Sequence, residues 1–314
     1  MAIPVVDLSE FLKGEPIQRN LFVHKLGKAY EDVGFVAVKN HGIPQSLIDD
    51  LYKYVKAFFS LAVLQKLNYQ KPELAGQRGY TSFGQEHAKG FDAPDLKEFF
   101  QYGQTAEGEK MPLEDYPPNI SVEEVPQLAP TLYQAFRHFE NSGKALLSAI
   151  AIYLGLEENY FDQYIHNGNS IIRCIHYPPI TQEPKSAIRA EQHEDINLIT
   201  LLVGASADGL QVMNKDNEWV SATSEPDQIV VNVGDMLQRL TNNKLRSTTH
   251  RVVNPPRDKW NTSRYSIPFF LHPRSEMSLA CLKNCIDENH PKAYEDITAG
   301  EYLNERLKEI GLKK

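Results

Sequence analysis

The sequence has few cysteines, no long apolar run and no excess of basic residues, and each absence excludes a class of protein. Three cysteines in 314 residues are too few for a disulfide framework and indicate reduced thiols. No apolar run approaches the roughly 20 residues that a membrane-spanning helix requires. The 41 acidic residues outnumber the 33 basic ones, and this net charge of −8 argues against a nucleic-acid-binding surface.

A secretory signal is not expected either, because the opening MAIPVVDLSEFLKGE lacks a basic segment and meets acidic residues at once. We therefore expect a cytoplasmic protein that acts on a small molecule rather than on a nucleic acid or a membrane. The 41% hydrophobic and 24% charged content is typical of a globular domain with an ample core. Nothing in the sequence indicates an oligomeric state.

The pattern of apolar residues predicts one domain, 1–314, in three parts. Residues 1–168 form a mixed, mainly helical region. Residues 169–274 contain several short β-rich runs separated by Gly, Asn and Pro, a pattern typical of a sandwich or barrel. Residues 275–314 end in a helical segment.

Within the N-terminal region, helical spacing predicts a helix over 16–33, a second one from Pro44 onward, and a helix or helix pair over about 126–166. A short strand is expected at 3–7 and another within FVAVKNHGI. Residues 72–125 show little periodicity, and a segment of that length is usually functional or mobile.

Two histidines and one aspartate are candidate metal ligands. His193 and Asp195 lie in QHEDINLITLL; if both are strand residues, their side chains share one face. His250 stands in a second β-rich run, STTHRVV. Two histidines and a carboxylate on one side of an ion form the facial triad of non-heme iron(II) oxygenases.

The spacing H-x-[DE] is weak evidence alone. A second example, His138 and Glu140, lies in a helical pattern, where residues two apart do not face each other. For His193 and Asp195 the alternative is a turn in which both side chains make local hydrogen bonds.

Arg264 and Ser266 in RYSIPFF are candidate ligands of an anion. Both share one face of the expected strand, and an inward-facing guanidinium suits a carboxylate. An ion pair with a structural Asp or Glu is the alternative.

The order of these motifs resembles the isopenicillin N synthase-like branch of the 2-oxoglutarate/iron(II)-dependent dioxygenases. The resemblance covers nearly the whole chain. Its further segments are IPVVDL, GFVAVKNHGIP, HYPP, VNVGDMLQRLTNNKLRSTTHRVVNP and ITAGEYLNERL.

The resemblance implies a fold and a set of roles. The fold is mainly β, a double-stranded β-helix or jelly roll wrapped by N-terminal and C-terminal helices. His193, Asp195 and His250 would ligate Fe(II), and Arg264, Ser266 and Tyr177 would bind 2-oxoglutarate. The enzyme would use O2 to oxidise, most often to hydroxylate, an unactivated C–H bond of a small molecule, releasing succinate and CO2. Ile175 stands where many plant relatives have asparagine, two residues before the tyrosine.

Candidate substrate contacts come from two segments. Strand alternation from Arg264 and Ser266 places Phe270 on the same face. RGYTSFGQEHAKG, residues 78–90, mixes Tyr80, Phe83 and Gln85 with glycines, as the cover of an active site does. Ordinary core packing and a plain surface loop are the respective alternatives.

Two other functions fit the same residues. An iron-dependent oxidase of this fold does not use 2-oxoglutarate, and Arg264 would then bind a substrate carboxylate. A non-oxidative metal-binding β-helix protein, either a zinc-type isomerase or hydrolase or a ligand-binding module, would use the same ligands.

Overall fold

The computed structural model describes residues 3–86, 93–106, 108, 116–184, 186–204, 209–309 and 312. Its strands form two sheets, and all neighbouring strands are antiparallel except β1 and β2. The eight-stranded sheet contains, in spatial order, β1 (Val5–Asp7), β2 (Phe35–Lys39), β10 (Ile229–Val233), β7 (Ile199–Val203), β12 (Arg264–Leu271), β5 (Ile171–Tyr177), β4 (Glu98–Gly103) and β3 (Gly79–Thr81). The four-stranded sheet contains β6 (Ala190–His193), β11 (His250–Val252), β8 (Leu210–Met213) and β9 (Trp219–Ser221).

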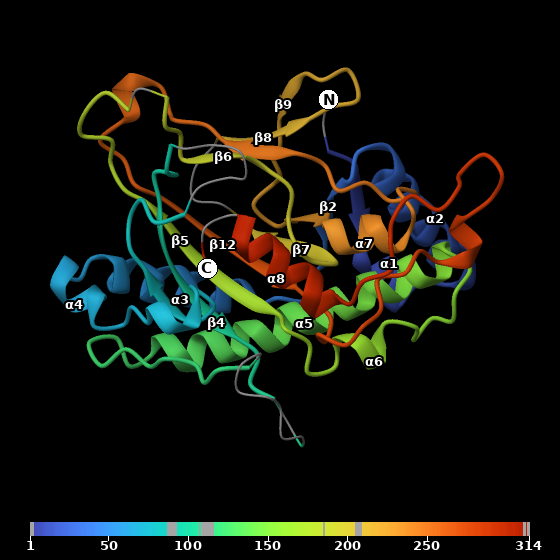
Figure 1. Ribbon diagram of the computed structural model, residues 1–314, viewed down its shortest axis with the longest axis horizontal. Coiled ribbons are helices and arrows are strands. Elements are labelled where there is room, and N and C mark those ends of the chain that lie inside the picture. The colour runs from blue at the N-terminus through green and yellow to red at the C-terminus, as the bar shows by residue number, and fades with distance from the viewer. Residues whose placement is uncertain are drawn as a thin grey trace.

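The small sheet lies over one face of the large sheet, as Figure 1 shows. Phe35 of β2 and Val230 of β10 belong to one apolar cluster with Val212 of β8. A second cluster joins Tyr177 of β5 to Val252 of β11. These contacts close the two sheets into the jelly roll that the sequence predicts.

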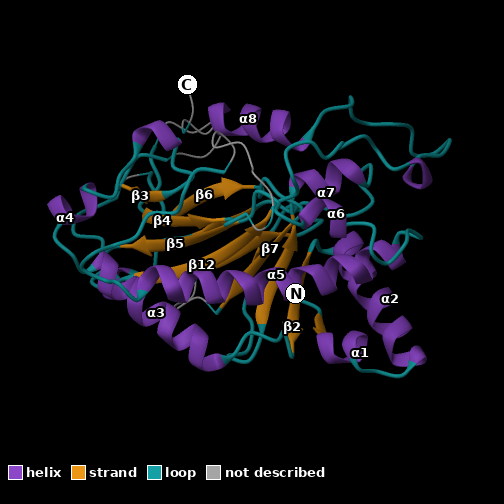
Figure 2. Ribbon diagram, turned by 90° about the horizontal axis from the view of Figure 1, so that it is seen from below, coloured by secondary structure: helices purple, strands orange, loops and turns teal. Residues whose placement is uncertain are grey.

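The helices Gln45–Phe59 and Leu128–Tyr153 cover the opposite face of the large sheet, whereas the helix Ala299–Glu309 lies on the side of the small sheet (Figure 2). The helices are α1 (Leu8–Leu12), α2 (Pro16–Asp32), α3 (Gln45–Phe59), α4 (Val63–Leu67), α5 (Leu128–Tyr153), α6 (Asp162–Ile165), α7 (Asp235–Leu240) and α8 (Ala299–Glu309). Alternation along β12 decides which side chains meet them: Phe269 is fully buried against Phe136 and Phe139 of α5, with ring centroids 5.1 and 5.2 Å away. Residues 264, 266, 268 and 270 therefore face the small sheet.

The expected helices are confirmed, and 126–166 is a helix pair. Helix α5 ends at Tyr153, and Gly155 follows with φ of 69°. Glycine adopts this left-handed conformation without the penalty of a Cβ, so it ends the helix before α6 begins.

The segment 72–125 contains more structure than its sequence indicates. Strands β3 and β4 add to the large sheet here, beside β5. Every residue of β4 is buried, so its sequence EFFQYG lacks the alternation that marks a half-exposed strand. Glu98 tolerates this burial because Lys66 Nζ, Tyr80 Oη and His176 Nδ1 all lie within hydrogen-bonding distance of its carboxylate.

Within the described residues, no helix combines the length and the apolar character needed to cross a lipid bilayer.

Candidate active site

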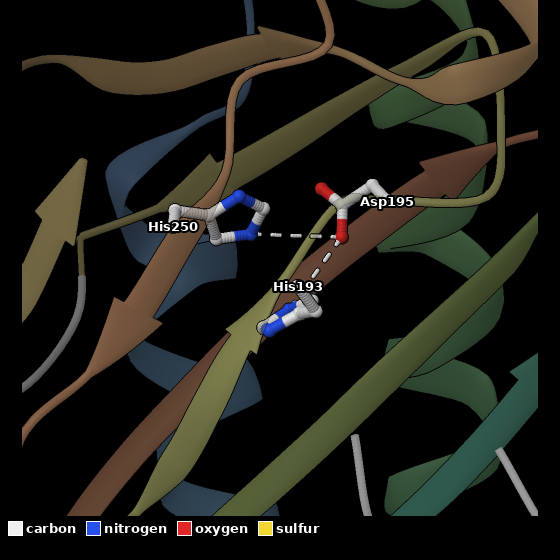
Figure 3. Close-up of side chains that lie close together, drawn as sticks. All are labelled: His193, Asp195 and His250. Carbon is white, nitrogen blue, oxygen red and sulfur yellow. Dashed lines mark ion pairs between the residues drawn. The ribbon is translucent and has the colours of Figure 1, made fainter. Parts of the chain in front are cut away.

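Two histidines face each other across the small sheet. His193 ends β6, His250 begins β11, and they are direct partners in the antiparallel register. Their ring centroids are 4.4 Å apart. Asp195 completes the group, with Oδ1 4.0 Å from His193 Nε2 and 3.7 Å from His250 Nε2 (Figure 3).

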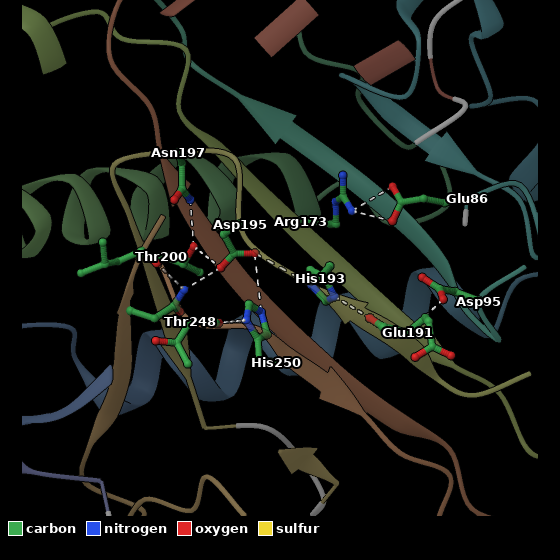
Figure 4. Close-up of polar contacts among 12 residues, drawn as sticks. Glu86, Asp95, Arg173, Glu191, His193, Asp195, Asn197, Thr200, Thr248 and His250 are labelled. Carbon is green, nitrogen blue, oxygen red and sulfur yellow. Dashed lines mark hydrogen bonds and ion pairs between the residues drawn. The ribbon is translucent and has the colours of Figure 1, made fainter. Parts of the chain in front are cut away.

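Asp195 is not a strand residue, which corrects the strand argument made from QHEDINLITLL. Strand β6 ends at His193, and Asp195 lies in the connection to β7. Hydrogen bonds hold its carboxylate instead: Thr200 Oγ1 donates to Oδ2 at 2.7 Å (Figure 4), and Asn232 Nδ2 donates to Oδ2 at 2.8 Å. Oδ1 is thereby directed at the two histidines.

The hydrogen bonds of the two imidazoles fix which nitrogen is available. His193 Nδ1 lies 2.7 Å from the carbonyl oxygen of Glu191, and His250 Nδ1 lies 3.0 Å from that of Thr248. A carbonyl oxygen only accepts, so each Nδ1 carries a proton and donates it. In the neutral imidazole, Nε2 then presents its lone pair toward Asp195.

The electrostatics keep these groups in the form that binds a metal ion. Burial and the neighbouring His250 lower the pKa of His193 to about 4. Burial alone would raise the pKa of Asp195, but His250, His193 and the bonds from Asn232 and Thr200 lower it below its usual value. Neutral imidazole and ionised carboxylate are the ligand forms of these residues.

The three donor atoms fit one ion. They all lie within 4.8 Å of one another, so small side-chain rotations bring them to the separations of about 3 to 4 Å that bonds of about 2 Å to a shared ion allow. The partners of Nδ1 and Oδ2 are the outer hydrogen bonds that orient metal-binding side chains.

These residues line a cavity of about 480 Å³ between the two sheets. Arg264 and Ser266 of β12 and Tyr177 of β5 line it too, and each is at most 4% exposed. Arg264 pairs with Tyr177 in the register, and its guanidinium lies 5.0 Å from the centroid of the Tyr177 ring. Three residues that the sequence predicts to share a site are therefore together.

Arg189, which the sequence analysis missed, adds a second cation near Tyr177. It is 2% exposed, with its guanidinium 5.9 Å from the Tyr177 ring centroid. Burial, followed by repulsion from Arg264, lowers its pKa to about 10, so it is still charged at neutral pH. This end of the cavity is thus strongly electropositive. The segment RAEQH could have indicated it, because Arg189 lies four residues before His193 and residues four apart share one face of a strand.

The structure places the four predicted substrate contacts differently with respect to the cavity. Phe270 lines the cavity. Tyr80, Phe83 and Gln85 are not among the described residues that line it: Tyr80 is buried with its hydroxyl bonded to Glu98, and Phe83 is 48% exposed. Residues 87–90 of that expected cover lie outside the described residues.

Several polar residues of the cavity wall were not predicted. They are Glu86, Asp95, Lys97, Gln101, Arg173 and His272. Glu86, Asp95, Lys97 and Gln101 come from β4 and the segment before it, where an irregular pattern hid the strand, whereas Arg173 lies on β5, which the β-rich run SIIRCIHY predicted. Arg173 and His272 carried a usable signal, since they continue the cavity-facing alternation of Tyr177 and Phe270. From α8, Leu303 and Leu307 also line the cavity.

The fold and this cluster together define a class of protein: a jelly roll whose interior holds a His-Asp-His group able to bind a metal ion, with a buried arginine at one end of the cavity. Comparison with known proteins narrows the class. Residues 168–273 match the model of the 2OG-Fe(II) oxygenase superfamily, and residues 3–124 match that of the non-haem dioxygenase in morphine synthesis N-terminal region.

Relatives match over almost their full length. Proline hydroxylase buaE of Petromyces alliaceus is 32% identical, with 98% of this chain and 99% of the relative covered. A crystal structure of a 2OG-Fe(II) oxygenase family protein from Caulobacter crescentus is 40% identical, covers 98% of this chain and 99% of its own, and has a TM-score of 0.88. A full-length protein of Neurospora crassa, crystallised in complex with alpha-KG and thymine, is 29% identical, covers 98% and 96%, and has a TM-score of 0.85.

The chain belongs to the 2-oxoglutarate/iron(II)-dependent oxygenase family. It is a 2-oxoglutarate-dependent non-heme iron dioxygenase, with Fe(II), 2-oxoglutarate and O2 as its cofactor and co-substrates and a small molecule as its substrate.

Proposed function

We propose that His193 Nε2, Asp195 Oδ1 and His250 Nε2 ligate the iron(II). The observation that carries this proposal is the convergence of the three donor atoms within 4.8 Å, with the other nitrogen of each imidazole and the other carboxylate oxygen already hydrogen-bonded. The set is two imidazoles and one carboxylate, as in the facial triad.

Arg264 and Ser266, with Tyr177, bind the distal carboxylate of 2-oxoglutarate. Their burial at one end of the cavity supports this role, because a guanidinium buried there is best stabilised by an anion. Arg189 reinforces the positive potential, although it is not among the described residues that line the cavity.

The reaction is the hydroxylation of an unactivated C–H bond. Bound iron, with 2-oxoglutarate and O2, supplies the oxidising power for it. The protein's own contribution is to orient the substrate against Phe270 and the neighbouring wall and to exclude water between the two sheets.

The remaining expectations follow from composition and fold. The chain is one domain, since β1 to β4 and the later strands share the large sheet. It is cytoplasmic, and its net charge of −8 disfavours nucleic acid and anionic membrane as partners. The related proteins name two different kinds of substrate, proline in one name and thymine in one complex.

Anaerobic spectroscopy tests this function. Fe(II) and 2-oxoglutarate together should give a weak visible charge-transfer band, and His193→Ala should abolish it, whereas His138→Ala, in the H-x-E pair on α5, should retain it. Absence of the band in the wild type, together with no succinate formation, contradicts the proposal. Calorimetric titration with 2-oxoglutarate separates it from the oxidase alternative, which requires no such binding.

A further inference from the structure

One wall of the cavity is not used by the iron ligands or by the 2-oxoglutarate residues. It consists of Gln101, Arg173, Phe270 and His272, which all line the cavity. Gln101 is the register partner of Arg173 on the neighbouring strand. Arg173 is four residues from Tyr177 along β5, a distance of roughly 13 Å in a strand. A molecule held here is therefore separate from one held by Arg264.

Among the described residues, the hydrogen bonds of Arg173 engage Nε and Nη1 but not Nη2. Nε donates to Gln101 Oε1 at 2.7 Å, and Nη1 donates to both carboxylate oxygens of Glu86 at 3.1 Å. Figure 4 shows Glu86 engaging this side of the guanidinium. Within the described part of the chain, Nη2 has no hydrogen-bond partner. A carboxylate binds arginine best through two adjacent N–H groups, so the free Nη2 suits the single oxygen of a carbonyl group.

The charges of this wall cancel one another. Lys97 Nζ lies 2.6 Å from Glu86 and 2.7 Å from Asp95, so two cations face two carboxylates. Burial would raise the pKa of Glu86, but Arg173 and Lys97 lower it to about 2, and it remains ionised. An anionic substrate would lose its hydration here without gaining a net opposite charge. An uncharged polar molecule avoids that cost.

His272 and Phe270 supply the other features of the wall. His272 is 7% exposed, and its Nδ1 has no hydrogen-bond partner among the described residues. Burial lowers its pKa to about 4, so it is a neutral imidazole with one donor and one acceptor. Phe270 is only partly buried and lies 5.4 Å from the Arg173 guanidinium, measured to the ring centroid. Its ring offers a flat apolar surface for stacking.

We propose that this wall binds the substrate as an uncharged, planar cyclic amide, with the ring stacked on Phe270, a ring carbonyl accepting from Arg173 Nη2, and a ring N–H or carbonyl paired with His272. The inference rests on the proposed function, since it names the substrate class of that same site. Of the two kinds of substrate that the relatives' names suggest, proline and thymine, the inference favours the planar ring of thymine.

Anaerobic calorimetry with Fe(II) and 2-oxoglutarate already bound tests the substrate class. The probes are thymine, orotate, which carries a carboxylate on the same kind of ring, and L-proline, which is charged and not planar. Thymine should bind at least tenfold more tightly than orotate or proline. Tighter binding of orotate or proline, or no binding of thymine to protein that binds 2-oxoglutarate, overturns the substrate class alone. Failure to bind 2-oxoglutarate in the first titration contradicts the proposed function instead.

Variants test the two named contacts. Arg173→Gln should weaken thymine at least tenfold and leave the affinity for 2-oxoglutarate unchanged, since Arg264 lies at the other end of the cavity. Arg173→Lys keeps the charge beside Glu86 but not the planar fork, so it should also weaken the binding of thymine. It takes the place of Arg173→Gln in the test if that variant does not fold. His272→Phe, which keeps a planar ring but removes both nitrogens, should weaken thymine as well. Unchanged thymine affinity in the folded variants overturns the assignment.

Discussion

His250 Nε2 lies 3.7 Å from Asp195 Oδ1, although the two residues come from a strand and a connection far apart in the chain. Three other contacts fix this relationship: the pairing of His250 with His193, and the hydrogen bonds from Thr200 and Asn232 to the second carboxylate oxygen. Protein contacts thus hold both side chains in the orientation that a shared metal ion requires.

Loss of the carboxylate should abolish tight metal binding. Asp195→Ala leaves two imidazoles, and we expect the affinity for Fe(II) or Mn(II) to fall by at least 100-fold, more than for a residue that only orients a ligand. Anaerobic calorimetry measures this. Asp216→Ala, an exposed carboxylate in the turn between β8 and β9, is the matched control and should bind metal like the wild type.

Thr200 should affect the metal without contacting it. Thr200→Val keeps the shape but removes the hydrogen bond to Asp195 Oδ2, so the carboxylate is less well oriented. We expect metal affinity to fall by about 10- to 100-fold, which is typical when a residue that orients a metal ligand is lost. An affinity equal to that of the wild type would show that Asn232 alone suffices to hold Asp195.

Arg264 should determine the affinity for 2-oxoglutarate. Arg264→Met removes the buried, charged fork that lines the cavity, and we expect the Kd to rise by at least 100-fold, or about 3 kcal/mol. Arg251→Met is the control, because Arg251 stacks over Trp219 on β9, 4.0 Å from its ring centroid, and is not among the described residues that line the cavity. Equal losses in both variants would contradict a specific role for Arg264.

His272 should make the stability of the metal-free protein depend on pH. Burial lowers its folded-state pKa from 6.5 to about 4, so the unfolded chain binds the proton more readily between these values. Stability then rises with pH through this window, and protonation of unfolded His272 costs the folded protein about 2 kcal/mol at pH 5 relative to pH 8. Denaturant titrations with chelator present at both pH values measure it.

The matched variants separate this contribution from other titrating groups. His272→Phe removes the ionisable ring and should lessen the loss of stability between pH 8 and pH 5. His290→Gln, a substitution at a histidine whose side chain is 71% exposed, is the matched control and should show the same loss as the wild type. The same pH dependence in His272→Phe as in the wild type would show that other groups produce it.

Breaking the buried ion pair behind the cavity should destabilise the fold. Lys66→Met leaves the Glu98 carboxylate buried without its cation, 2.7 Å away in the wild type, and we expect a loss of about 3–5 kcal/mol. The double variant Lys66→Met, Glu98→Gln removes both charges and should recover part of that loss. Thermal and denaturant unfolding check both variants.

The short β-rich runs predicted a sandwich or barrel, and the family resemblance carried by the ordered motifs implied the jelly roll and the convergence of His193, Asp195 and His250. The sequence did not predict how Asp195 is placed. Strand alternation placed His193 and Asp195 on one face, and the two residues do lie together, but not for that reason. The chain leaves the strand after His193, and side-chain hydrogen bonds orient Asp195 instead. Such bonds join Thr200 and Asn232 to Asp195 across separate strands, and no local pattern records them.

In the substrate wall, Gln101 was missed because its strand was not recognised, and Arg173 and His272 were missed although they continue the alternation of Tyr177 and Phe270. Strand β4 is buried on both faces, so its pattern resembles neither a half-exposed strand nor a helix. The cover expected at Tyr80 and Phe83 was inferred from composition, whereas burial of Tyr80 depends on Glu98, which lies on that same unrecognised strand. Phe270 was found because the alternation along β12 could be counted from Arg264.

The two sheets contribute different functional groups to the cavity. His193 and His250 come from the small sheet, whereas Arg173, Phe270 and Arg264 all come from the large one. Mutations in β4 and β5 can therefore reshape what the pocket accepts without disturbing the metal, and the same scaffold can diverge toward new substrates while its oxidative chemistry is inherited intact.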